Sequence, residues 1–257
     1  TLTQAASIIM GANIGTTISA FIMALSSAGG SWFSVTAVFA LVAFVGFAIT
    51  LVSKRDKVKR IGNILVGVGL IFIGLSVMSG AVSSMLADEQ INHAVRSLFQ
   101  IFEPPLTWEI IVLFLLGALL TALMQSSAAL TAIVISLASQ GLITLQAAMC
   151  IILGANVGTC LTSLISSIGA TVNAKRAAAV HLLFNVAGCV IFIFPVAFAG
   201  DYIAKFLNSF INDTEWQIAI FHMFFNLVTT LLLLPFLKWL VKLACLIVPD
   251  KTGGKSG

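Results

Sequence analysis

The chain contains 257 residues, of which 60% are hydrophobic and only 9% are charged, and its formal net charge is +4. A soluble globular domain carries about 25% charged residues, so this chain has too few charges to cover a water-exposed surface. The composition, with a mean hydropathy of +1.12, excludes a cytosolic enzyme, a disordered protein and a nucleic-acid-binding protein. It predicts a helical integral membrane protein.

The first two apolar regions differ in their continuity. Residues 32–52 form an unbroken apolar stretch, and a helix needs about 20 such residues to cross a bilayer. Residues 1–28 are interrupted by the small polar residues of GANIGTT at 11–17. A cluster of Gly, Asn and Thr at membrane depth favours a break in the helix. We therefore predict a broken helix over 1–28, followed by a single span over 32–52.

The middle of the chain is predicted to contain a span, a surface helix and a hairpin. Residues 61–86 are long enough to span, and 88–103 have the pattern of an amphipathic helix outside the membrane. The apolar region 106–139 is interrupted by QSS at 125–127. A straight helix over its 34 residues would be roughly 50 Å long, too long for a hydrocarbon core of about 30 Å. The sequence therefore predicts a hairpin with QSS at its tip.

The C-terminal part is predicted to contain a second broken helix and two further spans. Residues 145–170 are interrupted by GANVGTC at 154–160, whereas 177–199 and 217–240 are continuous. The four cysteines lie in apolar stretches without a CxxC pair, so we expect them to pack in the core. The polar, Gly-rich tail at 250–257 is expected to be a linker.

The distribution of charge predicts the orientation. Basic residues cluster at 53–60, at 174–176 and near the C-terminus, whereas acidic residues occupy the loops at 88–103 and 201–215. The positive-inside rule then places the basic clusters in the cytoplasm and the acidic loops outside. Under this constraint the hairpin must be re-entrant, entering and leaving on the outer side. The two broken helices must then point in opposite directions.

The two broken helices also share a sequence. Residues 2–19 and 145–162 align without gaps at an offset of 143, which pairs Asn13 with Asn156 in the pattern GAN-I/V-GT-T/C. With opposed directions, this match predicts an inverted-topology repeat, an architecture that holds the substrate near the membrane midplane between discontinuous helices. We assign 1–60 to the end of the first repeat and 61–249 to the second. Because the chain begins inside an apolar segment, we expect a fragment that lacks the first hairpin.

These motifs resemble the type II sodium–phosphate cotransporter family, whose repeat pairs a QSSSA hairpin with a downstream GANIGTT helix. The segments that carry the resemblance are QSSAA at 125–129, GANIGTT at 11–17, GANVGT at 154–159, GLIFIGLSVMSGA at 69–81, HLLFN at 181–185 and FHMFFN at 221–226. One departure is Ala128, which stands where the family has its third Ser. A second is the absence of the first QSSS hairpin.

The resemblance implies a multi-pass transporter of the bacterial inner membrane that couples sodium to inorganic phosphate. Its implied partners are phosphate, membrane lipid and no nucleic acid. The missing hairpin and a cytoplasmic domain resembling the phosphate-uptake regulator are further implied partners, and a homodimer stays open. Sodium is expected as the co-transported ion, with no organic cofactor.

The predicted core contains no Lys or Arg, so an anion there must be bound by other groups. Broken helix ends offer free N–H groups and the positive end of the helix dipole, and glycines allow close approach. The residues predicted to bind phosphate are Gln125, Ser126, Ser127, Gly15, Thr16, Gly158 and Thr159. Neutral hydroxyl and amide oxygens suit sodium. The residues predicted to bind sodium are Asn13, Thr17, Asn156, Ser127 and Gln125.

Two His–Asn pairs are predicted to support this core. His181 and Asn185, and likewise His222 and Asn226, lie four residues apart on one helical face. We expect hydrogen bonds between helices, with a proton relay as the alternative. No third ligand has suitable spacing, so a transition metal such as zinc is not expected. Glu109, early in the hairpin, is expected to be a solvated charge at the outer interface.

Other functions stay open at this stage. The same fold could carry another small anion or export phosphate, and a fragment could be a non-transporting scaffold. The small polar residues of GAN and QSS could also serve only to pack helices. An intramembrane enzyme is disfavoured, because the sequence has no pair of membrane aspartates, no HExxH and no GxSG turn.

Overall fold

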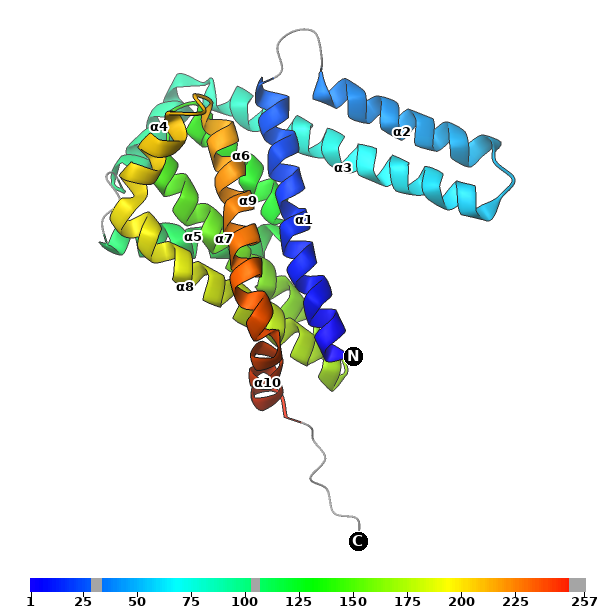
Figure 1. Cartoon of the computed structure of the whole chain (residues 1–257). Helices are drawn as coiled ribbons and strands as arrows, with labels where there is room; N and C mark the ends of the chain where they lie inside the picture. The colour runs from blue at the N-terminus through cyan, green and yellow to red at the C-terminus, as the bar shows by residue number, and fades with distance from the viewer. Residues whose placement is uncertain (29–33, 103–106, 250–257) are drawn as a thin grey trace.

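A computed structural model describes residues 1–28, 34–102 and 107–249, and it places them in helices joined by short turns (Figure 1). In chain order the helices are α1 (Leu2–Ala28), α2 (Val35–Val52), α3 (Asp56–Leu86), α4 (Glu89–Gln100), α5 (Thr107–Met124), α6 (Ser127–Ser139), α7 (Leu145–Ser166), α8 (Val172–Asn208), α9 (Thr214–Leu233), the 3₁₀ turn η1 (Leu234–Phe236) and α10 (Leu237–Ile247). The described residues contain no strand, which confirms the predicted all-helical class. The predicted linker at 250–257 lies outside the described residues.

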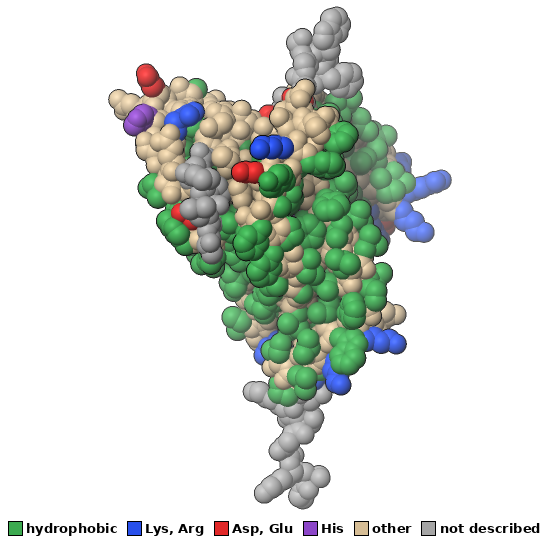
Figure 2. All heavy atoms as spheres, turned by 60° about the vertical axis from the view of Figure 1, so that its left-hand side comes forward, with side chains coloured by type: hydrophobic (Ala, Val, Ile, Leu, Met, Phe, Trp, Pro, Cys, Tyr) green, Lys and Arg blue, Asp and Glu red, His purple; other side chains and the backbone are tan. Residues whose placement is uncertain are grey.

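The described part of the chain has six helical segments long and apolar enough to cross a membrane: Leu2–Leu25, Val35–Val52, Asp56–Leu86, Leu145–Ser166, Val172–Asn208 and Thr214–Ile247. Helices α5 and α6 are apolar but shorter. Figure 2 shows apolar side chains over the middle of the visible face. The predicted multi-pass membrane protein is thus confirmed. The expected amphipathic helix is α4, whose first turn is capped by Asp88 through the backbone N–H groups of Gln90 and Ile91.

Helices α2 and α3 form an arm that projects from a bundle of the other helices (Figure 1). Glycines bring the two backbones together, since a Cβ on Gly46 would lie 2.6 Å from the carbonyl oxygen of Gly62. The outer surface of the arm is apolar, and Phe44 is 66% exposed. Such a surface suits contact with lipid or with another helix.

The bundle is built around α7, in which residues 146–156 are all buried. Helix α8 runs antiparallel to it, because the Cys189 thiol donates to the carbonyl of Leu153 at 3.1 Å and Ser163 contacts His181 at 3.1 Å. Helix α5 runs parallel to α7, with Gly117 against Ile151 and Thr121 against Gly158. Helix α6 returns from the end of α5 to the start of α7, so both ends of the α5–α6 hairpin lie at one end of α7.

Helix α1 lies beside α9 (Figure 1) and runs antiparallel to it. The rings of Phe21 and Trp216 are 5.9 Å apart near one end, and Ala20 packs with Ala219. Nearer the start of α1, Met10 packs in a cluster with Leu237 of α10. Helix α1 is therefore held by the C-terminal helices, far from it in sequence.

The predicted breaks in the two GAN segments are wrong, because α1 and α7 continue through both of them. A backbone in apolar surroundings must satisfy its hydrogen bonds internally, and a helical Gly costs only about 1 kcal/mol relative to Ala. The polar side chains also bond back to their own helix. The Asn13 amide donates to the carbonyl of Ile9 at 3.1 Å, and the Thr16 hydroxyl to that of Asn13 at 2.7 Å.

The interruptions lie instead in two segments that were predicted to be simple spans. Helix α8 bends at Ala199, four residues after Pro195, and continues to Asn208. The proline frees the carbonyl of Ile191, one turn before it, so it does not account for a bend at Ala199. The Gln146 side chain of α7 packs against Gly200 at the bend, and a side chain that enters the backbone hydrogen-bond ladder kinks a helix. The amide of Gln146 on α7 donates to the carbonyl of Val196 at 2.8 Å and so caps the bend. The second predicted span, 217–240, is interrupted by η1, which contains Pro235.

Candidate functional site

The sequence QSS forms the turn between α5 and α6, as predicted. Gln125 has a φ of 54°, and it is the one non-glycine residue with positive φ in the described part of the chain. This conformation costs about 1 kcal/mol for a residue with a Cβ. Ser126 then begins α6, and its Oγ accepts a hydrogen bond from the N–H of Ala129 at 3.1 Å. The turn between the two apolar helices is therefore both strained and capped.

The start of α6 can bind an anion. The first N–H groups of a helix have no acceptor within the helix. In α6 the N–H of Ala129 is bonded to Ser126, so the N–H groups of Ser127 and Ala128 are left without an acceptor. The helix dipole adds positive potential at the same place. Ser126 and Ser127 are half-buried and Gln125 is exposed, so a small solute can reach them. No Lys or Arg occurs between residues 97 and 174.

In α7 the two glycines of the GAN segment are packing positions. A Cβ on Gly154 would overlap the carbonyl oxygen of Phe114, and one on Gly158 would overlap that of Ala118. Helix α5 therefore lies directly on the glycine face of α7. The structure places Gly158 under α5 rather than in a cleft, and Thr159, half-buried beside it, donates its hydroxyl to the carbonyl of Ala155 at 3.0 Å.

In α1 the equivalent glycines are uncovered. No atom beyond the backbone of α1 itself lies within 4 Å of a Cβ built on Gly11 or Gly15, and both residues are exposed. Asn13 and Thr17 are buried on another side of the helix, at 4% and 3% exposure. Thr16 is half-buried. The same motif thus presents its glycines to a neighbour in α7 and to open space in α1.

Four buried asparagines, on α1, α7, α8 and α9, share one conformation. Each side-chain amide nitrogen donates to the backbone carbonyl four residues earlier: Asn13 to Ile9 at 3.1 Å, Asn156 to Ile152 at 2.8 Å, Asn185 to His181 at 3.1 Å and Asn226 to His222 at 3.1 Å. Because an N–H must face each carbonyl, the side-chain oxygen is the free end of each amide. Neutral amide oxygens are ligands that hard cations prefer.

The helix registers place these asparagines in two pairs. Between α7 and α8, the contacts of Leu153 with Cys189 and of Ser163 with His181 bring Asn156 and Asn185 to nearly the same level. The side chains of Asn185 and Cys160 are also in contact. Between α1 and α9, Ala20 packs with Ala219 in a cluster. Asn13 lies seven residues before Ala20 and Asn226 seven residues after Ala219, so an antiparallel pair brings them level.

Comparison with known proteins identifies the family. The model of the family described as Na+/Pi-cotransporter matches residues 1–80 and 85–211. The chain belongs to the Na+/Pi-cotransporter family. This confirms the resemblance seen in the motifs, and it confirms a family of transporters rather than of enzymes.

Three relatives illustrate what the chain is similar to. It is 28% identical to "Uncharacterized protein YqeW" of Bacillus subtilis over 95% of its own length and 72% of the relative's. It is 28% identical to "Putative inorganic phosphate export protein YjbB" of Escherichia coli K12 over 97% of its length, but it spans only 42% of that protein. With mouse "Sodium-dependent phosphate transport protein 2C" it shares 32% identity over 54% of its length and 23% of the relative's. No solved structure matches the chain.

His181 and His222 differ in their contacts. His181 makes the expected contact between helices, with its Nδ1 3.1 Å from Ser163 Oγ. His222 is 3% exposed, and its Nδ1 has no partner in the described residues. Within these same residues no group of three or more His, Cys, Asp and Glu side chains could hold a metal ion.

Sequence reasoning missed three polar residues and misplaced one. Thr229, fully buried, packs on Gly188, and its position three residues after Asn226 could have revealed it. Gln146 and Ser163 make contacts between helices that only the tertiary structure defines. The prediction that Glu109 is a solvated edge charge is wrong, since it is 7% exposed and lies next to the core residue Ile110 in the first turn of α5.

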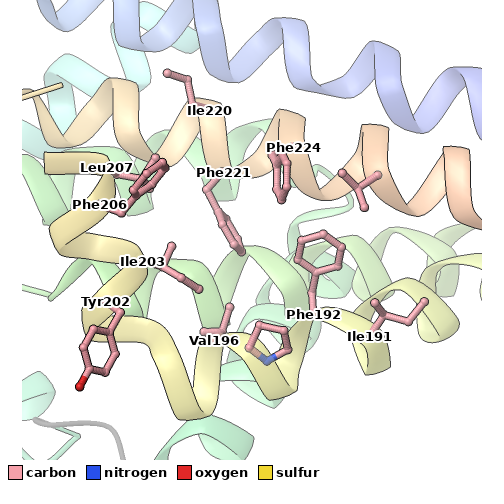
Figure 3. A pocket seen from close by; sticks show the side chains of 12 residues that line it. Ile191, Phe192, Val196, Tyr202, Ile203, Phe206, Leu207, Ile220, Phe221 and Phe224 are labelled. Atoms are coloured by element: carbon pink, nitrogen blue, oxygen red, sulfur yellow. The ribbon is translucent and has the colours of Figure 1, made fainter. Parts of the chain in front are cut away.

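A cavity of about 590 Å³ between α8 and α9 is not a phosphate site. It occupies the angle made by the bend of α8, and Figure 3 shows Phe192 and Phe221 among the side chains that line it. The lining is apolar except for the hydroxyl of Tyr202. A phosphate ion there would lose its hydration without gaining the hydrogen bonds that replace it.

Proposed function

We propose that this chain is part of a secondary transporter that couples sodium to the movement of inorganic phosphate across the bacterial inner membrane. The observation that carries the proposal is the break at Gln125–Ser127. It opens two backbone N–H groups and two serine hydroxyls between apolar helices, in a segment without basic residues. Such a group of donors selects an anion.

Phosphate binds at the start of α6 in this proposal. The N–H groups of Ser127 and Ala128 and the hydroxyls of Ser126 and Ser127 donate hydrogen bonds to phosphate oxygens, while the Gln125 amide closes the site. Thr159 contributes from α7, beside the tip of the hairpin. Gly15 and Thr16 contribute from α1 as the equivalent positions of the repeat. Gly158 acts by letting α5 approach α7.

Sodium compensates the charge of phosphate, since residues 97–174 contain no Lys or Arg. Its ligands in this proposal are the side-chain oxygens of Asn13, Thr17 and Asn156, with Ser127 and Gln125 shared between the ion and phosphate. Coupling follows because an anion without a basic partner is stable in this site only when cations bind with it. Binding of sodium and phosphate should therefore be mutually favourable.

The two GAN helices belong to an inverted repeat in this proposal, and the exposed glycine face of α1 takes a helix equivalent to α5. Two observations support it: the aligned sequences and the cover that α5 gives to the same face of α7. Such a helix would bring a second QSS tip to the site. The α5–α6 hairpin would then be re-entrant from the outer side, with its tip near the midplane.

The orientation places the three basic clusters in the cytoplasm. In Figure 2 the charged side chains visible at the lower end, near α10, are basic, whereas the upper end carries acidic and basic side chains together. The acidic side chains at the upper end agree with the proposed orientation for α8, α9 and α10.

The direction of transport has two candidates. The name of the Escherichia coli relative favours export, and the name of the mouse relative favours sodium-dependent transport. Both use the same site, so one experiment can decide between them. The full-length parent protein is placed in proteoliposomes, and radiolabelled phosphate is followed in each direction with sodium or choline on either side.

The expected result is phosphate flux that depends on sodium and falls at least tenfold in Ser127→Ala and in Asn156→Ala. Equal flux in the two variants and the parent would remove the hairpin tip and the GAN segment from the site. Equal flux in sodium and choline would instead reject the coupling and leave the site intact.

A further inference from the structure

Helices α8 and α9 share a motif that the GAN repeat does not include. Residues 181–185 (HLLFN) and 222–226 (HMFFN) both follow the pattern His-x-x-Phe-Asn. Phe184 and Phe225 are each 1% exposed, and Asn185 and Asn226 are fully buried. The two copies therefore share a sequence pattern and the burial of its Phe and Asn, on two helices that run in opposite directions.

Each copy contains an oxygen atom without a partner. The side-chain oxygens of Asn185 and Asn226 are inaccessible to solvent and accept no hydrogen bond from any described residue. The hydroxyl of Thr229, one turn after Asn226, is in the same state. A buried acceptor without a donor costs about 1–3 kcal/mol, so a bound ion or water is the usual explanation. These oxygens cannot be satisfied by turning the amides, because the amide nitrogens are bonded to the carbonyls of His181 and His222.

Each copy also has its asparagine level with one GAN asparagine. Asn185 is level with Asn156 across α7 and α8, and Asn226 is level with Asn13 across α1 and α9, as the registers above define. Each seam thus offers two amide oxygens. The groups are neutral oxygens, and no described acidic residue lies within one turn of any of the four asparagines on its own helix. This donor set suits a monovalent hard cation rather than calcium or a transition metal.

We propose that Asn185 and Asn226 are direct cation ligands, and that the chain has two sodium sites, one in each seam between a GAN helix and a His-x-x-Phe-Asn helix. This inference rests on the proposed sodium coupling and adds to it. Asn185 and Asn226, which the sequence analysis predicted to support the core, are ligands in this proposal. One site contains Asn156 and Asn185, and the other contains Asn13 and Asn226.

The test must separate a ligand from a structural amide. Asn185→Asp keeps an oxygen at the site but loses the N–H that bonds to the carbonyl of His181, whereas Asn185→Leu loses both. The same pair of substitutions applies to Asn226. Ser136→Ala is the matched control, since Ser136 is buried at 3% exposure and bonds to Ser79 of α3, away from both seams.

The measurement is the thermal unfolding midpoint of the purified full-length parent, titrated with sodium chloride against choline chloride. A ligand that binds only the folded state raises the midpoint with its concentration. We expect each leucine variant to need at least ten times more sodium for the half-maximal shift, and the double leucine variant to show none. The aspartate variants and Ser136→Ala should respond at the sodium concentration of the parent or below it.

Three results would overturn the inference. Leucine variants with the sodium response of the parent would mean that the orphan oxygens hold water or nothing. If the aspartate variants lose the sodium response as the leucine variants do, the amide N–H supports the response through its structural hydrogen bond, and the side-chain oxygen is not a ligand. The aspartate variants also decide the case if a leucine variant fails to fold. A parent with no sodium response and no sodium-driven flux would reject the proposed coupling itself, whereas a responsive parent with unaffected variants rejects only these two sites.

Discussion

The GAN segments of α1 and α7 have nearly the same sequence but different surroundings. In α7 the glycines lie under α5, and a Cβ on Gly154 would overlap the backbone of Phe114. In α1, Gly11 faces open space. The asparagines do not differ, since Asn13 and Asn156 are both buried with the same back-bonded amide. The comparison separates two parts of one motif: the glycines of α7 are a docking face for α5, whereas the asparagine has the same buried conformation in both helices, as expected if it belongs to the proposed binding site.

The largest effect should come from filling the glycine face. Gly154→Ala should lower the free energy of unfolding by about 3 kcal/mol or more, because the new Cβ meets backbone that cannot rotate away. Gly11→Ala in the same chain should change it by about 1 kcal/mol at most, in the stabilising direction, since alanine favours helix. Thermal or denaturant unfolding of the two variants in detergent measures the difference.

The same pair tests the proposed docking of a second helix. In the full-length parent, Gly11→Ala should become as harmful as Gly154→Ala if a helix equivalent to α5 covers α1. If Gly11→Ala stays harmless there, the two copies of the motif are not equivalent and the repeat has lost its symmetry.

A second prediction concerns the strained turn at Gln125, between α5 and α6. Gln125→Gly should raise stability by about 1 kcal/mol, because glycine accepts a positive φ without a penalty. It should also reduce phosphate flux at least tenfold, through loss of the side-chain amide. Unfolding and flux measured on one preparation of the full-length parent give both values. Unchanged flux would show that Gln125 serves the turn alone.

A third prediction compares equivalent residues at the start of α1 and of α7. Gln146, which bonds to Val196 at the bend of α8, aligns with the exposed Thr3 of α1. Gln146→Leu should lower stability by about 1 kcal/mol, because it leaves the carbonyl at the bend without a donor. Thr3→Val should have no measurable effect. Equal unfolding midpoints for the two variants would mean that the bend does not need Gln146.

The smallest effect on stability is expected at Thr16 and Thr159, which make the same kind of hydrogen bond in α1 and α7. The hydroxyls of Thr16 and Thr159 both bond back to carbonyls of their own helix. Thr16→Val and Thr159→Val should each change stability by about 0.5 kcal/mol at most, since such bonds contribute little to a helix. A difference of more than about 1 kcal/mol between them in unfolding experiments would show that one threonine has a second partner.

Several features were predictable from the sequence because they depend on local composition. The predicted spans over 61–86 and 177–199 fall within α3 and α8, whereas 217–240 is divided by η1. The hairpin breaks at Gln125–Ser127, as expected of a polar cluster in an apolar stretch that is too long for one crossing. The GAN match and the QSS motif were sufficient to find the family. The same reasoning failed at 11–17 and 154–160, because clusters of Gly, Asn and Thr resemble a break while their side chains bond back to a continuous helix.

The sequence by itself determined that the chain belongs in a membrane, which stretches are apolar enough to cross it, and which motifs repeat. These properties follow from the free energy of transferring a segment out of water, which depends only on the residues of that segment. Only the tertiary structure decided which glycines are covered, where α8 bends onto α9, and that Asn156 lies level with Asn185. Those facts depend on the register between helices far apart in the chain, and register is set by side-chain packing that no single segment contains.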